Sequence, residues 1–398
     1  MTLVNNKLQF SLLYFDGKGG ALAGDRYRLL VEGAKFADKH GFTAVWTPER
    51  HFHEFGGLYP NPAITSAALA MITERVQLRA GSVVIPLHNP LRVAEEWAAV
   101  DNLSQGRVGI SFASGWHADD FALAPENYAE REAAMIRGID AVRRLWRGES
   151  IEGLNGFGKK IEMRTFPKPI QRELPVWVTC SGNPATFVRA GEVGGGVLTH
   201  LLGQSIEELQ SKIKLYRDTL AEHEHSAGTG HVTLMLHAFI GEELETVRET
   251  VREPFSEYLL SSISLIQKQL ENSSSNGGAI PWSKAASIRS DRSPSSLKTS
   301  ELTKSEKAEL VAYGFDRYFD TAALFGTPET CFELVNRLAE IGVDEIACLI
   351  DFGVNVETAL TSISHLAELK DRCEKEALPA HLSEQESLRL MQDFNVPL

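Results

Sequence analysis

The sequence predicts an α/β protein built as a single (β/α)8 barrel, and three observations lead to this fold class. Short apolar, β-branched runs alternate with helical patterns along the chain, and eight such units can be counted. Alternating strands and helices imply parallel strands joined by crossover helices, and eight units is the number that closes a barrel. The chain has 398 residues, 43% of them hydrophobic, which is enough to bury one barrel with insertions.

The eight expected strands are the apolar runs of this pattern. They cover residues 10–15, 43–46, 76–85, 108–112, 176–179, 197–202, 232–240 and 345–350. Helical spacing of apolar residues is clearest over residues 62–72, 91–103, 131–146, 205–223 and 356–373. The first helix has apolar residues that recur from Tyr27 to Ala37, and it is expected to end at Gly41 because glycine commonly stops helices.

Two segments interrupt the alternation. Residues 150–172 contain three glycines and a Phe-Pro-Lys-Pro sequence, which favours a small antiparallel excursion after the fourth helix. Residues 267–300 are rich in Ser, Asn, Gly and Pro, and we expect a mobile insertion between strands seven and eight, either an active-site lid or an idle solvated loop. We therefore expect one domain over residues 1–377 and a tail over 378–398 that is either a docking helix or a frayed end.

Charge and composition exclude several classes of function. The net charge of −13 disfavours nucleic-acid binding, because an acidic surface repels phosphates. No apolar run is long enough to cross a membrane, and the N-terminus is too short and too weakly basic for a signal peptide. The four cysteines are far apart and form no CxxC pair, which indicates free thiols in a reducing compartment. We expect a cytoplasmic protein that acts on small molecules.

Polar residues that follow the strands are the candidates for an active site, because catalytic groups of this fold lie at the C-terminal ends of the strands. Strand two is followed by Arg50, His51 and His53, and strand four by His117 and Asp120. Further candidates at later strand ends are His200, His237 and Asp351. Loops are polar in any case, so the polar residues at these strand ends suggest a site without identifying its chemistry.

The sequence Ser181-Gly182-Asn183, with Pro184 after it, is the best candidate for a phosphate site. The glycine lets the backbone approach a ligand closely, the proline suits the first turn of a helix, and the free N–H groups of that turn attract anions. The alternative is that Asn183 is an ordinary helix N-cap. Neither a Walker motif nor a G-x-G-x-x-G fingerprint after a strand is present, so nucleotide sites of those types are not expected.

His51 and His53 form an H-x-H pair that raises a second class of function, a metal-dependent barrel hydrolase. With His200 and Asp351 they would supply imidazole and carboxylate ligands, and such ligands must converge on one ion. The pair follows the second strand rather than the first, and no clear lysine or histidine follows the fifth. We therefore expect no metal site, with His53 in an exposed loop and His51 over the barrel mouth.

Several sequence blocks, in the right order, resemble the bacterial-luciferase-like flavin-dependent monooxygenases. They are TPERHFHEFG at 47–56, VIPLHNPLRVAEE at 84–96, DNLSQGR at 101–107 and GTPE at 326–329. The resemblance runs from about residue 8 to 372, leaves 267–300 unmatched, and is closest to the subgroup found in non-ribosomal peptide and polyketide gene clusters. It implies that FMNH2 and O2 form a C4a-(hydro)peroxide, which oxygenates a small-molecule or carrier-protein-bound natural-product intermediate.

The resemblance also assigns roles to individual residues. The residues that it places at the cofactor are Gly81, Ser82, Ala113, Ser114, Ser181, Gly182, Asn183 and Thr186, with the FMN phosphate at the last four and a non-proline cis peptide at about Gly81–Ser82. The residues that it places at the reaction are His51, Arg50, His117 and Asp120. Among these, His51 is the first choice for proton transfer near the flavin.

Arg50 is a departure from the family pattern. Bacterial luciferase has two histidines after the glutamate, and here Arg50 takes the place of the first, which makes light emission from aldehydes doubtful. Arg50 could instead bind a carboxylate or phosphate or stabilise a peroxide anion. The alternative is that Arg50 only forms a salt bridge with Glu49 or Glu54.

The resemblance implies partners and leaves alternatives. A separate reductase is expected to supply the reduced flavin, because the chain has no NAD(P)H fingerprint, and a homodimer is expected through the helices at 62–73 and 91–104. A deazaflavin (F420)-dependent oxidoreductase that transfers hydride, and a catalytically idle flavin-binding protein, are the alternatives on the same fold. The sequence leaves open the substrate and the choice among N-hydroxylation, C-hydroxylation and Baeyer–Villiger oxidation.

Overall fold

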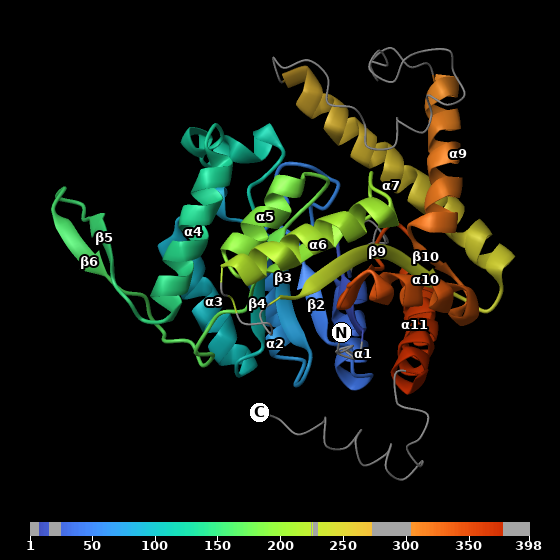
Figure 1. Cartoon of the computed structure of the whole chain (residues 1–398), viewed down its shortest axis with the longest axis horizontal. Helices are drawn as coiled ribbons and strands as arrows, with labels where there is room; N and C mark the ends of the chain where they lie inside the picture. The colour runs from blue at the N-terminus through green and yellow to red at the C-terminus, as the bar shows by residue number, and fades with distance from the viewer. Residues whose placement is uncertain (1–7, 16–24, 224, 226–229, 273–303, 377–398) are drawn as a thin grey trace, which may run out of the picture.

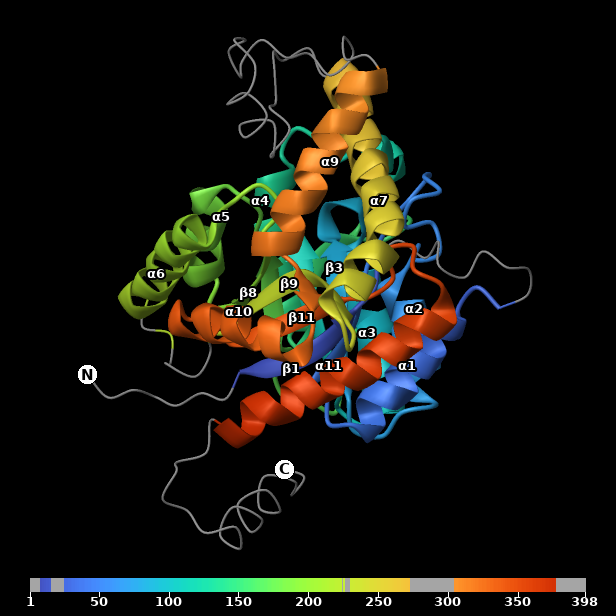
Figure 2. The same ribbon diagram turned by 90° about the vertical axis from the view of Figure 1, so that its right-hand side faces the viewer.

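The computed structural model describes residues 8–15, 25–223, 225, 230–272 and 304–376, and within them eight parallel strands close into a barrel with helices around it (Figures 1 and 2). The barrel strands are β1 (Gln9–Leu13), β2 (Ala44–Thr47), β3 (Gln77–Val84), β4 (Val108–Ala113), β7 (Val176–Thr179), β8 (Gly196–His200), β9 (Val232–Ile240) and β11 (Glu345–Leu349). Each pairs in parallel with its neighbour in this order, β8 pairs with β9, and β11 returns to β1. The predicted barrel is confirmed.

The helices of the described residues follow the strands. They are α1 (Arg28–Lys39), α2 (Pro62–Ala70), α3 (Pro90–Ser104), α4 (Arg131–Trp146), α5 (Pro184–Glu192), α6 (Ile206–Glu222), α7 (Leu244–Asn272), α9 (Lys304–Thr321), α10 (Pro328–Glu340) and α11 (Val356–Glu376). Three of them begin at an Asn-Pro pair, in which the Asn61, Asn89 or Asn183 side chain accepts a backbone N–H of the first turn. Such a cap satisfies a donor that the helix leaves free, and proline fits the first helical position.

A buried ionic network crosses the barrel interior near the start of the strands. Arg79 of β3 and Glu345 of β11 are separated by two strands, yet Arg79 Nη1 lies 2.7 Å from Glu345 Oε2. The rings of Trp46 and Trp177 lie 5.0 and 4.5 Å from the guanidinium carbon. Burial alone would raise the pKa of Glu345, but the charge of Arg79 and a hydrogen bond with His231 outweigh burial and lower that pKa. Both charged residues and both tryptophans are buried.

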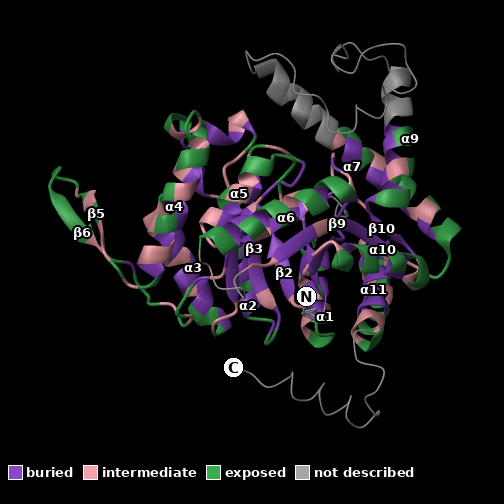
Figure 3. Ribbon diagram, in the orientation of Figure 1, coloured by how far each residue is buried: buried purple, intermediate pink, exposed green. Residues whose placement is uncertain are grey.

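The expected antiparallel excursion is present. Strands β5 (Ile151–Leu154) and β6 (Lys160–Met163) pair antiparallel and project away from the barrel, and both are largely exposed (Figures 1 and 3). A further short strand, β10 (Leu324–Gly326), pairs with the last three residues of β9 and was not predicted. Three residues are too few to show a period, so the sequence carried no signal for this strand.

The expected insertion at 267–300 needs a partial correction. Residues 267–272 continue α7, because Gln-Lys-Gln-Leu-Glu-Asn contains no glycine or proline and its long side chains favour helix. The remainder of this insertion, 273–300, lies outside the described residues, as does the expected tail at 378–398. Helices α7 and α9 lie side by side against the barrel (Figure 2). In the described part of the chain, no helix has the length and apolar content that crossing a membrane requires.

Candidate active site

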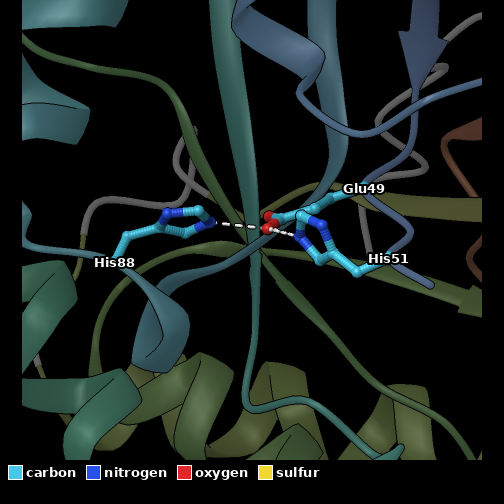
Figure 4. Close-up of side chains that lie close together, drawn as sticks. All are labelled: Glu49, His51 and His88. Carbon is cyan, nitrogen blue, oxygen red and sulfur yellow. Dashed lines mark hydrogen bonds and ion pairs between the residues drawn. The ribbon is translucent and has the colours of Figure 1, made fainter. Parts of the chain in front are cut away.

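Two imidazoles, from the loops after β2 and β3, meet at the carboxylate of Glu49. Glu49 Oε1 accepts hydrogen bonds from Nε2 of His51 at 2.7 Å and from Nε2 of His88 at 2.5 Å (Figure 4). The second oxygen of Glu49 accepts the backbone N–H of Val84 at 2.8 Å. Because an ionised carboxylate can only accept hydrogen bonds, each Nε2 carries a proton, and both imidazoles are held in one orientation.

The charges of this cluster stabilise one another. Burial alone would raise the pKa of Glu49, but the hydrogen bonds from His51 and His88 outweigh burial and lower this pKa. Burial alone would lower the pKa of His88, but the hydrogen bond and the charge of Glu49 raise it. The cluster therefore favours an ionised Glu49 beside a protonated His88 over a wider pH range than the free groups would allow.

The loop that carries His51 makes a sharp turn at the next residue. Phe52 has φ +58°, a left-handed conformation that a bulky residue seldom adopts. Its ring is 64% exposed and lies 5.7 Å from the ring of His51. A strained residue of this kind persists where the surroundings hold it, and such residues cluster at active sites.

The two histidines of the H-x-H pair do not converge. Among the described residues, the His51 side chain groups with those of Glu49 and His88, with possible ligand atoms within 4.8 Å of one another. The His53 side chain groups in the same way with His117 and Asp119. The rings of His53 and His117 are 4.5 Å apart. The hypothesis that His51 and His53 ligate one metal ion is therefore wrong. The expectation that His53 is an exposed loop residue also needs correction, because its side chain is partly buried against β4's loop.

Arg50 is buried between aromatic rings. Its guanidinium carbon lies 5.3 Å from the ring of Trp116 and 5.8 Å from that of Phe15. Burial lowers the pKa of Arg50, and the nearby charge of Asp120 acts against this. Gly56 has φ +79°, and a Cβ there would lie 2.6 Å from Arg50 Cγ, so the aliphatic stem of Arg50 occupies the space that the glycine leaves.

The alternative that Arg50 only forms a salt bridge with Glu49 or Glu54 is wrong. The oxygens of Glu49 are bound to His51, His88 and a backbone N–H. In the described part of the chain, no ion pair joins Arg50 to either glutamate, and the Nε and Nη2 atoms of Arg50 are buried without a hydrogen-bond partner. Asp120 Oδ1 is also buried and unpartnered, and burial raises the pKa of Asp120.

The cis peptide that the resemblance implies is present between Gly81 and Ser82, where β3 also shifts its register against β4. The hydroxyl of Ser82 is hydrogen-bonded to that of Thr179, which also bonds to the Ser111 hydroxyl at 2.7 Å. Small and hydroxylated side chains thus line the ends of three neighbouring strands, β3, β4 and β7.

The candidate phosphate segment lies at the start of α5. Asn183 caps this helix, because its Oδ1 accepts the N–H of Ala185 at 3.0 Å, so the alternative of an N-cap is confirmed. Ser181 and Gly182 are exposed, and a Cβ on Gly182 would meet no atom within 4 Å. The cap leaves other N–H groups of the first turn available to an anion, so capping and phosphate binding are compatible here.

The later strand ends supply a different environment. Burial lowers the pKa of His200 to about 4 and that of His237 to about 3, so both imidazoles are neutral at neutral pH. Asp351 accepts the backbone N–H of Phe15 at 2.7 Å and the hydroxyl of Tyr59 at 3.2 Å. These contacts join loops around the barrel end.

The residues present fit a flavin nucleotide. The exposed residues Ser181, Gly182 and Asn183 at the start of α5 suit a phosphate, because the N–H groups at the start of a helix attract anions. The small residues Gly81, Ser82, Ala113 and Ser114 at the ends of β3 and β4 would let a flat ring approach the backbone. Sequence reasoning missed Glu49 and His88 as partners of His51. The available signal was position, since Glu49 lies shortly after the end of β2, and His88 follows the short 3-10 helix (Ile85–Leu87) that comes after β3.

Residues 8–345 match the family described as luciferase-like monooxygenase. The oxygenase component of the flavin-dependent trigonelline monooxygenase of Acinetobacter baylyi is 28% identical over 230 residues, which is 57% of this chain and 63% of that protein. The F420-dependent glucose-6-phosphate dehydrogenase of Amycolatopsis mediterranei is 30% identical over 181 residues, 43% of this chain and 53% of that protein.

The chain thus spans less than two thirds of the length of these two relatives. Among solved structures, the monooxygenase RslO1 from Streptomyces bottropensis is similar with a TM-score of 0.69 and 25% identity, over 91% of this chain and 98% of that chain. The similarity therefore includes the barrel as a whole and is not confined to one motif.

Proposed function

This chain belongs to the luciferase-like monooxygenase family, and from that membership we propose that it is an FMN-dependent monooxygenase. The proposed reaction uses FMNH2 and O2 to oxygenate a small molecule or a natural-product intermediate bound to a carrier protein. The observation that supports it most is the meeting of Glu49, His51 and His88 where β2 and β3 end.

We assign FMN to the ends of β3, β4 and β7. Gly81, Ser82, Ala113 and Ser114 would lie along the ring system, and the segment from Ser181 to Thr186 would hold the phosphate at the start of α5. When bound and reduced, FMN supplies the electrons that activate O2. The protein must then orient the substrate and exclude water from the reaction.

His51 is the proposed proton donor and acceptor. Its Nε2 is committed to Glu49, so Nδ1 is the nitrogen that remains for exchanging a proton with a reacting group. Glu49 is a positioning residue, because it fixes the tautomer and the ring orientation of His51. His117 and Asp120, in the loop after β4, are proposed to lie on the other side of the reacting centre.

An F420-dependent oxidoreductase is the second candidate function, and the 30% identical glucose-6-phosphate dehydrogenase favours it. Such an enzyme would transfer hydride to or from its substrate without consuming O2. The exposed start of α5 would accept the phosphate of either cofactor. The two candidates therefore differ in the ring that binds and in the fate of oxygen.

We also propose a separate flavin reductase and a homodimer. The dimer is placed at α2 and α3, where Ile64 and Leu103 are 67% and 49% exposed, and Met71, directly after α2, is 70% exposed. Apolar side chains exposed together mark interaction surfaces more often than isolated ones do. Of the small residues on these helices, Ala70, Ala94 and Ala98 are buried within the monomer, whereas Ala68 is exposed, so a partner would cover Ala68 together with the larger exposed residues.

Titration with FMN, FMNH2 and reduced F420 tests the proposed function. We expect FMNH2 to bind more tightly than F420, and candidate intermediates incubated with FMNH2 under 18O2 to gain one labelled oxygen by mass spectrometry. Hydride transfer with F420 and no O2 consumption would establish the second candidate. Failure to bind either cofactor would reject both.

A further inference from the structure

Arg50 presents a charged edge that no described residue binds. Arg50 is 4% exposed, and the Nε and Nη2 atoms of its side chain are buried without a hydrogen-bond partner. An unpaired buried donor is costly, and a charged one more so. Because native proteins pair nearly all buried donors, these two N–H-bearing atoms indicate a ligand that accepts hydrogen bonds from them.

The rest of the side chain is fixed by packing. The rings of Phe15 and Trp116 lie near the guanidinium, at 5.8 and 5.3 Å from its central carbon. The stem rests on Gly56, where a Cβ would come within 2.6 Å. With its stem and its ring contacts fixed, the guanidinium cannot turn freely toward a distant partner, so the Nε–Nη2 edge keeps its position.

The charges around Arg50 define what it can bind. Glu49, the neighbouring residue, is occupied by His51 and His88. Asp120 is near enough to affect the pKa of Arg50, but the two form no ion pair within 4.0 Å, and Asp120 Oδ1 has no hydrogen-bond partner. One cation with an open edge thus lies near one carboxylate, which suits a singly charged anion better than a dianion.

We propose that the Nε–Nη2 edge of Arg50 binds a carboxylate group of the substrate. Two parallel N–H donors of a guanidinium match the two oxygens of a carboxylate. The inference rests on the proposed monooxygenase function and adds a substrate class to it, small organic acids. Arg50 then determines specificity by anchoring the acid end of the molecule beside His51.

Binding measurements on the full chain with FMN bound test this inference. The probes are three acid and amide pairs, octanoate with octanamide, phenylacetate with phenylacetamide, and N-acetyl-L-leucine with its amide, together with inorganic phosphate. Calorimetry gives the affinities, and fluorescence of the half-exposed Trp116 reports binding near Arg50. We expect at least one acid to bind about tenfold or more tightly than its amide, since hydrogen bonds to a charged group contribute that much.

Variants assign the preference to Arg50. Arg50→Met is expected to bring the acid and amide affinities to within about twofold of each other, because it keeps the stem and loses the charge. Arg137→Met, at a residue whose side chain is 65% exposed on α4, is the matched control and is expected to keep the preference. If Arg50→Met does not fold, Arg50→Lys is the variant that tests the inference. Arg50→Lys is expected to bind the acid more weakly than the wild type, because an ammonium group lacks the two parallel N–H donors of a guanidinium.

Three results would overturn the inference. They are acids that bind no more tightly than their amides, a preference that survives at Arg50→Met, and phosphate that binds more tightly than every acid. The same titrations without FMN separate this failure from failure of the proposed function. If the chain binds no FMN but still prefers acids to amides through Arg50, the proposed monooxygenase function is wrong and the proposed carboxylate site stands.

Discussion

Glu49 and His88 lie 39 residues apart in the sequence and share a hydrogen bond of 2.5 Å. The bond joins the loops after β2 and β3, which are neighbouring strands of the barrel. Because Glu49 also binds His51, one carboxylate orients two imidazoles at the barrel end. The arrangement makes Glu49 the residue through which the cluster can be tested.

Replacing Glu49 by glutamine should lower turnover more than it lowers FMN affinity. The amide carries no charge and offers one accepting oxygen instead of two, so His51 loses its fixed tautomer. We expect kcat to fall by about 100-fold, within the range of general acid–base catalysis. Glu152→Gln, which removes one partner of an exposed pair with Lys160 on the β5–β6 hairpin, is the control. Equal turnover in the two variants would contradict the role given to Glu49.

The pair of Glu49 and His88 should stabilise the fold over a limited pH window. The folded-state pKa of Glu49 is lowered, so its contribution is complete above the ordinary value of 4.5 and is lost as pH falls through the lowered pKa. The folded-state pKa of His88 is raised, so its contribution is complete below the ordinary value of 6.5 and is lost as pH rises through the raised pKa.

Urea unfolding of the wild type and of His88→Asn across pH measures this window. We expect the difference in the free energy of unfolding to be largest between pH 4.5 and 6.5, and to shrink on both sides. A difference that does not vary with pH would show that His88 contributes by packing alone.

Gly56 should tolerate alanine worse than a glycine that has a similar positive φ but open surroundings. Gly56 and Gly158 have φ +79° and +72°, so both variants incur the left-handed penalty of about 1–2 kcal/mol. At Gly158 a Cβ meets nothing within 4 Å, whereas at Gly56 it would lie 2.6 Å from Arg50 Cγ. Chemical denaturation should show Gly56→Ala less stable than Gly158→Ala by about 1–3 kcal/mol. Equal losses would mean that Arg50 moves aside freely.

Arg79 should be among the costliest side chains to remove. Its guanidinium pairs with the buried Glu345 inside the barrel, and Arg79→Met leaves that carboxylate without its cation. Breaking a buried pair on one side costs about 3–5 kcal/mol, which denaturant titration can measure. The double variant Arg79→Met, Glu345→Met removes both charges and should recover part of the loss. If the single variant were as stable as the wild type, the pair would not hold the barrel interior.

Gly182 should matter for FMN and not for folding. Neither Gly182 nor Gly156 has a positive φ, and a Cβ on either would meet no atom within 4 Å, so both alanine variants should unfold like the wild type. Only Gly182→Ala should weaken FMN binding, by about tenfold, because the phosphate is proposed to approach its backbone. Fluorescence titration with FMN measures this, and unchanged affinity in Gly182→Ala would move the phosphate elsewhere.

The barrel was predictable because its strands are apolar runs separated by helices with clear starts, such as Asn61-Pro62 and Asn89-Pro90. Positions at strand ends were predictable too, since the fold places them at one end of the barrel. Which of them touch was not, because a hydrogen bond between Glu49 and His88 depends on loop paths that no local pattern encodes. The same holds for the Arg79–Glu345 pair, whose partners are 266 residues apart.

The status of Arg50 shows the same limit. The sequence allowed either a ligand site or a salt bridge with a neighbouring glutamate. Glu49 is bound to two histidines instead, and these contacts depend on the folded paths of the loops after β2 and β3. Residues 273–300, which we expected to be a lid or an idle loop, lie outside the described residues, so their role stays a prediction.

A crystal structure of the chain soaked with FMN tests the central claim most directly. We predict the ring system against the cis Gly81–Ser82 peptide and the phosphate at Ser181, Gly182 and Asn183 at the start of α5, with His51 facing the ring. A ring bound elsewhere, or crystals that take up no FMN in either redox state, would contradict the proposed flavin site.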